Sequence, residues 1–144
     1  MKKDLIVKVI NGSQFELMED FVFYFPMLNG YRDCTLKVEK GFKTDFGSVP
    51  QAFQSFVSPI GKPTKAYVLH DRLCVANAKK ETWNKVAYDE RSDKIPIEYC
   101  NKVVTRKQAD KVFLEAMKTL GVGALKRYTI YFYVRLYAIL KGRR

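Results

Sequence analysis

The chain contains one histidine, His70, and an acidic residue, Asp71, follows it directly. An imidazole titrates near neutral pH, so His70 is a candidate for general acid–base catalysis or for a metal ligand. Successive helix side chains point about 100° apart, so Asp71 is badly placed to orient His70 as the acid of a catalytic triad would. Both side chains can still reach one metal ion, or each can take a partner from another element. The structural alternative is a buried, satisfied histidine beside an exposed aspartate.

A second group of polar residues lies in the segment GFKTDFGSVP, residues 41–50. Asp45 is a candidate metal ligand or general base in this segment, and Ser48 is a candidate nucleophile or phosphate donor. A loop aspartate and a serine before Val-Pro also commonly bond the backbone amides of their own turn. The segment therefore has both a catalytic and a structural interpretation.

A third acidic residue, Asp110, lies near the start of an expected helix, where the helix dipole stabilises a carboxylate. Its apolar neighbours, among them Phe113, also allow it to face inward toward His70. Three aspartates and one histidine suit Mg²⁺ or Mn²⁺ better than Zn²⁺. A single histidine excludes zinc sites built on two or three histidines. The sequence has no Walker loop and no GxGxxG, GxSxG or HExxH motif.

Positive charge is concentrated in the last third of the chain. The net charge is +11, and residues 102–144 hold eleven Lys or Arg against two acidic residues, a net of +9. Such a potential attracts nucleic acid, nucleotides or an acidic membrane surface. Arg106, Lys126 and Arg127 are the candidate anion-binding residues. The alternative is a solvated face that keeps the protein soluble.

The order of the elements predicts an α+β fold, because strand patterns come first and helical patterns follow. Alternating residues in 1–40 predict a small antiparallel sheet of three or four strands, with turns at Asn11-Gly12 and Asn29-Gly30 and a strand end at Pro26. About three helices should follow. We expect one domain, 1–144, that comprises a β-rich segment 1–40, a loop motif 41–62, a helix 63–76, a polar excursion or lid 77–101, and two basic helices within 105–144.

The boundaries of the last two helices carry local signals. Thr105 is an expected N-cap, and Gln108 completes a capping box with it. Gly121 should end the first of these helices. The last helix should run from about Ala124 to Leu140.

Three cysteines without CxxC spacing indicate neither a disulfide framework nor a zinc knuckle, and free thiols suit a reducing cytoplasm. The longest nearly uncharged apolar run, Tyr128–Leu140, has 13 residues and is too short to span a bilayer. The N-terminal residues show no signal peptide. We therefore expect a small soluble intracellular protein.

Taken together, the motifs resemble the phage and prophage family of domain of unknown function 1353. That family's pattern is roughly Gly-Phe-x-Thr-Asp-x-x-Ser-Val-Pro, then His-Asp-x-Leu, then Arg-x-x-Ala-Asp-x-x-Phe-x-x-Ala-Met. The matching positions are Gly41, Phe42, Thr44, Asp45, Ser48, Val49, Pro50, His70, Asp71, Leu73, Arg106, Ala109, Asp110, Phe113, Ala116 and Met117. The chain departs from the family at Phe46 and Cys74 and in a longer segment 77–101. The resemblance implies a phage-encoded accessory protein and groups Asp45, His70, Asp71 and Asp110 as one constellation.

The favoured hypothesis is a metal-dependent hydrolase, similar to a phosphodiesterase, that acts on an anionic nucleotide-type substrate in the cytoplasm of the infected host cell. Its catalytic residues would be His70, Asp45 and Ser48, and Asp45, His70, Asp71 and Asp110 would hold the divalent ion. One alternative is a non-catalytic module that binds nucleotides or nucleic acid. Another is a virion or assembly component that self-associates and uses the Asp/His set as a buried polar network.

Overall fold

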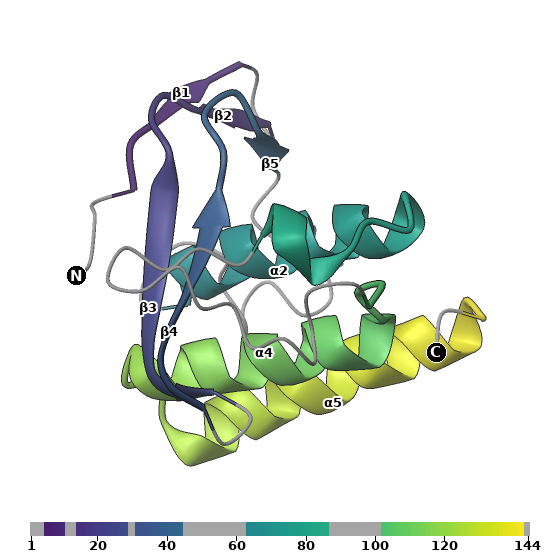
Figure 1. The fold of residues 1–144 in the computed structure, drawn as a ribbon. Coiled ribbons are helices and arrows are strands. Elements are labelled where there is room, and N and C mark those ends of the chain that lie inside the picture. Colours follow the sequence, from purple (N-terminus) through teal and green to yellow (C-terminus); the bar gives the residue numbers. More distant parts are fainter. Residues whose placement is uncertain (1–4, 11–13, 29–30, 45–62, 87–101, 143–144) are drawn as a thin grey trace.

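Strands come first in the structure and helices follow, which confirms the expected α+β fold (Figure 1). The computed structural model describes residues 5–10, 14–28, 31–44, 63–86 and 102–142. The strands are β1 (Val7–Val9), β2 (Phe15–Leu17), β3 (Phe21–Leu28), β4 (Tyr31–Val38) and β5 (Lys43–Thr44). The helices are α2 (Thr64–Ala78), the short 3₁₀ helix η1 (Trp83–Lys85), α4 (Arg106–Thr119) and α5 (Ala124–Leu140).

The strands form two antiparallel sheets, in the orders β1-β2-β5 and β3-β4. The two residues of β5 lie within the expected loop motif 41–62, where Thr44 pairs with Phe15 of β2. The prediction that Pro26 ends a strand is wrong, since β3 continues to Leu28. Among the described strands β3 pairs only with β4. A residue on the unpaired edge of β3 does not have to donate a backbone hydrogen bond to another strand, so a proline is tolerated there. The expected turns at 11–12 and 29–30 fall outside the described residues.

The helices largely follow the local signals in the sequence. The first begins directly after Pro63 and ends at Ala78, two residues beyond the expected limit. The last has the expected bounds, Ala124–Leu140. Gly121 has a φ of +81°, as expected for a glycine that ends the preceding helix. Most of the expected excursion, residues 87–101, lies outside the described residues. None of the helices in the described ranges is long and apolar enough to cross a membrane.

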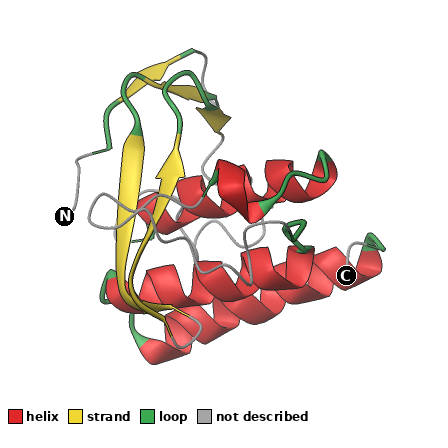
Figure 2. Ribbon diagram, viewed as in Figure 1, coloured by secondary structure: helices red, strands yellow, loops and turns green. Residues whose placement is uncertain are grey.

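The helices lie beside the long β3-β4 hairpin, with α4 between α2 and α5 (Figure 2). One buried cluster joins apolar side chains from both sheets and from all three long helices. Among its fully buried members are Phe25 of β3, Leu69 of α2 and Phe113 of α4. The middle of α2 and the start of α4 are therefore held against each other inside the protein. His70 of α2 and Asp110 of α4 lie in this region.

The capping box at the start of α4 is present as expected. The Thr105 hydroxyl accepts from the Gln108 backbone N–H at 3.1 Å, and the Gln108 side chain accepts from the Thr105 N–H at 3.1 Å. The same Gln108 oxygen also accepts from the Trp83 indole N–H at 3.3 Å. The cap therefore fixes η1 as well as the helix that carries Asp110.

Thr105→Ala is expected to lower the free energy of unfolding by about 1 kcal/mol, because an N–H at the helix start loses its acceptor. Urea denaturation followed by circular dichroism measures this loss. The matched control is Thr119→Ala at the other end of α4, where the hydroxyl only donates back to the Glu115 carbonyl. Equal losses for the two variants would show that the capping box does not stabilise α4.

Candidate functional site

His70 lies in α2 and faces α4, where its ring is almost completely buried. Its Nε2 is 2.6 Å from Oδ1 of Asp110 in α4. One face of the imidazole stacks on the ring of Phe113, with 4.6 Å between the ring centroids and 29° between the planes. The structure thus confirms that Asp110 turns inward toward His70. A carboxylate and an aromatic ring together fix the orientation of the only imidazole in the chain.

Asp110 is fully buried and receives hydrogen bonds from three helices. Besides His70 of α2, the Nε of Arg106 in its own helix donates to Oδ1 at 3.1 Å. The Nη1 of Arg135 in α5 donates to Oδ2 at 2.8 Å. Both carboxylate oxygens are therefore occupied. We refer to Asp110, His70, Arg106 and Arg135 as the Asp110 network.

The network determines which of its members carry charge. Burial lowers the pKa of His70 more than the hydrogen bond and negative charge of Asp110 raise it, and Arg106 lowers it further. Burial alone would raise the pKa of Asp110, but the hydrogen bond from His70 and the two guanidinium groups hold it below its usual range. Asp110 is therefore an anion at neutral pH and His70 is neutral. Donation to that anion requires the proton of His70 on Nε2, which leaves Nδ1 as the basic nitrogen.

The pKa of His70 is expected to lie below the ordinary value of about 6.5. Because the chain has one histidine, a single pair of imidazole NMR signals reports this titration without ambiguity. Above about pH 6.5 the imidazole is neutral in the folded and unfolded chain alike. Below it the unfolded chain takes up the proton first, so the free energy of unfolding should fall from about pH 6.5 down to the folded pKa. A pKa above 6.5, with stability that rises on acidification, would contradict this assignment.

Asp71 contacts the strand region through Thr44 of β5. Its Oδ2 accepts a hydrogen bond from the Thr44 hydroxyl at 2.5 Å. The carboxylate that contacts the imidazole nitrogen Nε2 of His70 is that of Asp110. One helical turn before Asp71, the hydroxyl of Tyr67 is buried and has no hydrogen-bond partner among the residues that the structure describes. Burial, and next to it the charge of Asp71, raise the pKa of Tyr67, so this hydroxyl keeps its proton.

Cys74 follows His70 by one turn of α2 and is only half-buried. Its Sγ lies 3.5 Å from Nε2 and 3.8 Å from Nδ1 of His70. A thiol bonded to Nδ1 in the ring plane would be much closer to that nitrogen than to the other. The similar distances therefore place the sulfur over the ring, on which it packs. This geometry does not match a thiol whose proton passes to His70.

The other candidates from the sequence do not join the described site. Asp45 and Ser48 lie outside the described residues. Arg106 is bound to Asp110, and neither Lys126 nor Arg127 forms a hydrogen bond or ion pair with His70 or Asp110. Instead, the Nη1 of Arg127 donates to the Val122 carbonyl. No group of three His, Cys, Asp or Glu residues that could hold a metal ion occurs in the described stretches of the chain.

Sequence reasoning missed two partners in this region, Arg135 and Thr44. Arg135 was visible as the single charge inside the apolar run Tyr128–Leu140. A lone cation among apolar helix residues indicates a buried anionic partner, since unpaired charges are rarely buried. Thr44 gave no such signal, because its contact with Asp71 joins residues 27 positions apart.

Comparison with known protein families gives a match over most of the chain. The family described as "Protein of unknown function (DUF1353)" matches residues 15–134. This range includes β2 to β5, α2, α4 and more than half of α5. It also includes His70, Arg106 and Asp110, whereas Arg135 is the first residue beyond it. No curated protein and no solved structure matches the chain.

Proposed function

This chain belongs to DUF1353, a family of proteins of unknown function, and from the geometry around His70 we propose that it is a hydrolase of an anionic substrate. The observation that carries the proposal is the buried Asp110–His70 pair, with 2.6 Å between Oδ1 and Nε2. A carboxylate that fixes the tautomer and orientation of an imidazole is a common device of general acid–base catalysis. His70 is the residue proposed to move the proton.

The protonation state of His70 supports the role of a base. Its pKa is lowered by burial, so Nδ1 can accept a proton at neutral pH. The hydroxyl of Tyr67, which has no hydrogen-bond partner within the described ranges, supplies a donor on the same helix. Asp110 would then act as a positioning residue that stabilises the imidazolium formed during the reaction.

The proposed substrate is a phosphodiester, most simply a nucleotide or a nucleic acid. This proposal rests on the charge of the helical region, where residues 102–144 carry a net +9. A strong positive potential raises the local concentration of anions. Lys126 and Arg127 are proposed to contribute to substrate attraction at a distance from His70.

A divalent ion, Mg²⁺ or Mn²⁺, is part of the proposal, but the donor set differs from the one expected from the sequence. Asp110 does not suit a metal, because its two oxygens already accept from His70, Arg106 and Arg135. Asp71 is the other described carboxylate of the candidate set. Its Oδ2 accepts a hydrogen bond from the Thr44 hydroxyl, and a carboxylate that accepts from a hydroxyl can also ligate a cation. We therefore propose that Asp71 and Asp45 would hold the ion, which when bound would polarise a phosphoryl oxygen.

A non-catalytic role is the second candidate, and the burial of the Asp110 network favours it. Asp110 is fully buried and His70 is 6% exposed, as in networks that fix a fold. The protein would then be a phage-encoded binding module for nucleotides or nucleic acid, or a virion or assembly component that self-associates. An enzyme encoded by a phage would act in the cytoplasm of the host cell.

The test compares hydrolysis of bis(4-nitrophenyl) phosphate and of cyclic and linear dinucleotides by the native chain and by His70→Gln. Assays contain Mn²⁺, Mg²⁺ or EDTA. Loss of the base is expected to reduce kcat by about 10²- to 10⁴-fold while the melting temperature shows a folded protein. Lys65→Gln, in the same helix, is the matched control and should keep full activity.

The pH dependence provides a second readout of the same proposal. The rate should rise with pH through a pKa below about 6.5 and then level off, because only neutral His70 accepts a proton. Full activity in His70→Gln would refute the role of His70. Saturable nucleotide binding without turnover by the native chain would support the binding module instead.

A further inference from the structure

Helix α5 presents a row of large apolar side chains to solvent. Leu125 is 81% exposed, Phe132 64%, Leu136 56% and Leu140 75%. Tyr128 and Ile139, also exposed, complete what we call the α5 row. The spacing of three and four residues places the row along one side of the helix. The opposite side, with Ile130, Val134 and Ala138, packs on the rest of the protein.

The outward face of α5 lacks the charged residues that normally solvate a surface helix. The helix has three charged residues, Lys126, Arg127 and Arg135. Arg135 turns inward to Asp110, and Arg127 bonds the Val122 carbonyl. A helix that is apolar on its inner and outer sides is usually covered on both. A continuous exposed row of this kind therefore indicates an interaction surface rather than scattered surface hydrophobics.

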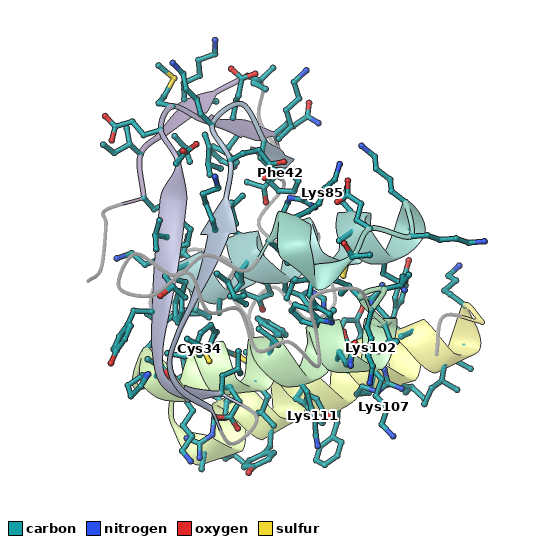
Figure 3. All side chains as sticks on the ribbon, in the orientation of Figure 1. Cys34, Phe42, Lys85, Lys102, Lys107 and Lys111 are labelled. Carbon is teal, nitrogen blue, oxygen red and sulfur yellow. The ribbon has the colours of Figure 1, made fainter. Side chains whose placement is uncertain are left out.

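Positive charge borders the α5 row, and negative charge is scarce there. No acidic residue follows Glu115 in the sequence. On the adjacent helix α4, the exposed side chains of Lys107, Lys111 and Lys118 are four and seven residues apart and so share one side. Figure 3 shows Lys107 and Lys111 in the region of the molecule formed by α4 and α5. Lys126 and Lys141 lie near the two ends of α5 itself. The apolar row thus has a cationic border.

We propose that the α5 row binds the surface of a lipid bilayer that contains anionic lipids, with α5 lying in the plane of the interface. Aliphatic and aromatic side chains on one side of a helix enter the boundary of the acyl chains, while flanking lysines contact anionic headgroups. No residue of the α5 row belongs to the Asp110 network, so the proposal does not depend on the role of His70; it shares with the proposed function only Lys126.

Charge and side-chain type favour a bilayer over two other occupants of the row. In a dimer formed through the α5 row, the cationic borders of the two copies would face each other. They would repel, and each copy has a net charge of +11. Nucleic acid would match the lysines, and its bases stack on aromatic rings, but it has no apolar region for Leu125, Leu136 and Leu140. A bilayer with anionic headgroups satisfies both the lysines and the leucines.

The first experiment is flotation of the full chain with vesicles. Vesicles of phosphatidylcholine with about one third phosphatidylglycerol are compared with pure phosphatidylcholine. Binding should be at least about tenfold stronger to the anionic vesicles, and salt should weaken it by screening the lysines. Equal partition into both vesicles, or no partition into either, would overturn the proposal.

The second experiment changes the row and its border separately. The double variant Phe132→Gln with Leu136→Gln should weaken vesicle binding at least about tenfold, because two large apolar contacts are lost. The double variant Lys126→Gln with Lys141→Gln should reduce binding to anionic vesicles only. The matched control, Ile6→Gln with Val9→Gln, changes two exposed apolar residues in and beside β1 and should bind like the native chain. Melting curves establish that each variant is folded.

Two further measurements distinguish the other occupants. If sedimentation velocity shows a dimer that Phe132→Gln with Leu136→Gln converts to a monomer, the row is a contact between copies and the proposal is wrong. If duplex DNA binds and the same double variant weakens that binding more than vesicle binding, the row serves nucleic acid and the proposal is also wrong. A monomer whose vesicle binding alone depends on the row supports it.

Discussion

Replacing Asp110 by alanine is expected to lower the free energy of unfolding by about 3–5 kcal/mol, because removal of one partner leaves buried charges without compensation. The guanidinium groups of Arg106 and Arg135 lose their carboxylate, although their side chains are only 8% and 15% exposed. The Nε2 proton of His70 loses its acceptor as well. The contact that joins α2, α4 and α5 disappears in one step. Urea denaturation at neutral pH measures the effect.

The control for this prediction is Asp20→Ala, in which an exposed carboxylate loses a single hydrogen bond from the Lys40 backbone N–H. We expect a loss of no more than about 1 kcal/mol there. Asp110→Asn retains the shape and removes the charge, so it should destabilise less than alanine. It should also lower the pKa of His70 further, since the Asp110 charge is one of the effects that raise it. Equal stability losses for Asp110→Ala and Asp20→Ala would refute the view that the network fixes the helices.

Local signals in the sequence predicted the helices well, because caps and breakers act within a few residues of one another. The capping box needs only Thr105 and Gln108, and Gly121 ends its helix through its own φ. The strands were harder to predict. Whether Pro26 interrupts β3 depends on which strands lie beside it, and the two residues of β5 form a strand only because β2 is there to pair with them.

The site could be predicted incompletely for the same physical reason. Residue types identified His70 and Asp110 as candidates, and the apolar flank of Asp110 allowed an inward position as one of two alternatives. Their contact joins positions 40 residues apart, so no local pattern could establish it. The contacts of Asp110 with Arg106 and Arg135 depend on how the helices pack. The sequence alone therefore predicts anion binding for Arg106 and no role at the site for Arg135. The sequence gives the number of Lys and Arg residues in a segment. Only the tertiary structure shows which of these side chains are already paired with a carboxylate.

Replacing Phe113 by alanine should also lower the free energy of unfolding by about 3–5 kcal/mol, through loss of a fully buried ring. Phe113 packs on Tyr67, with 5.1 Å between the centroids, and on the imidazole of His70. Its removal opens a cavity beside that imidazole. Because burial is the largest cause of the low pKa of His70, weaker burial should raise that pKa toward about 6.5. Histidine NMR signals recorded across pH measure this shift.

The control separates packing from the electrostatics of the site. Phe25→Ala removes another fully buried ring, which packs on Phe23 in the β3-β4 sheet. It should destabilise the protein by a similar amount and leave the pKa of His70 unchanged. Equal shifts of the His70 pKa in both variants would mean that general loosening, rather than the Phe113 ring, exposes the imidazole. A shift of the His70 pKa in Phe113→Ala alone would show that the Phe113 ring keeps water away from His70, the proposed base. A residue that stabilises the core would then also determine how readily His70 accepts a proton.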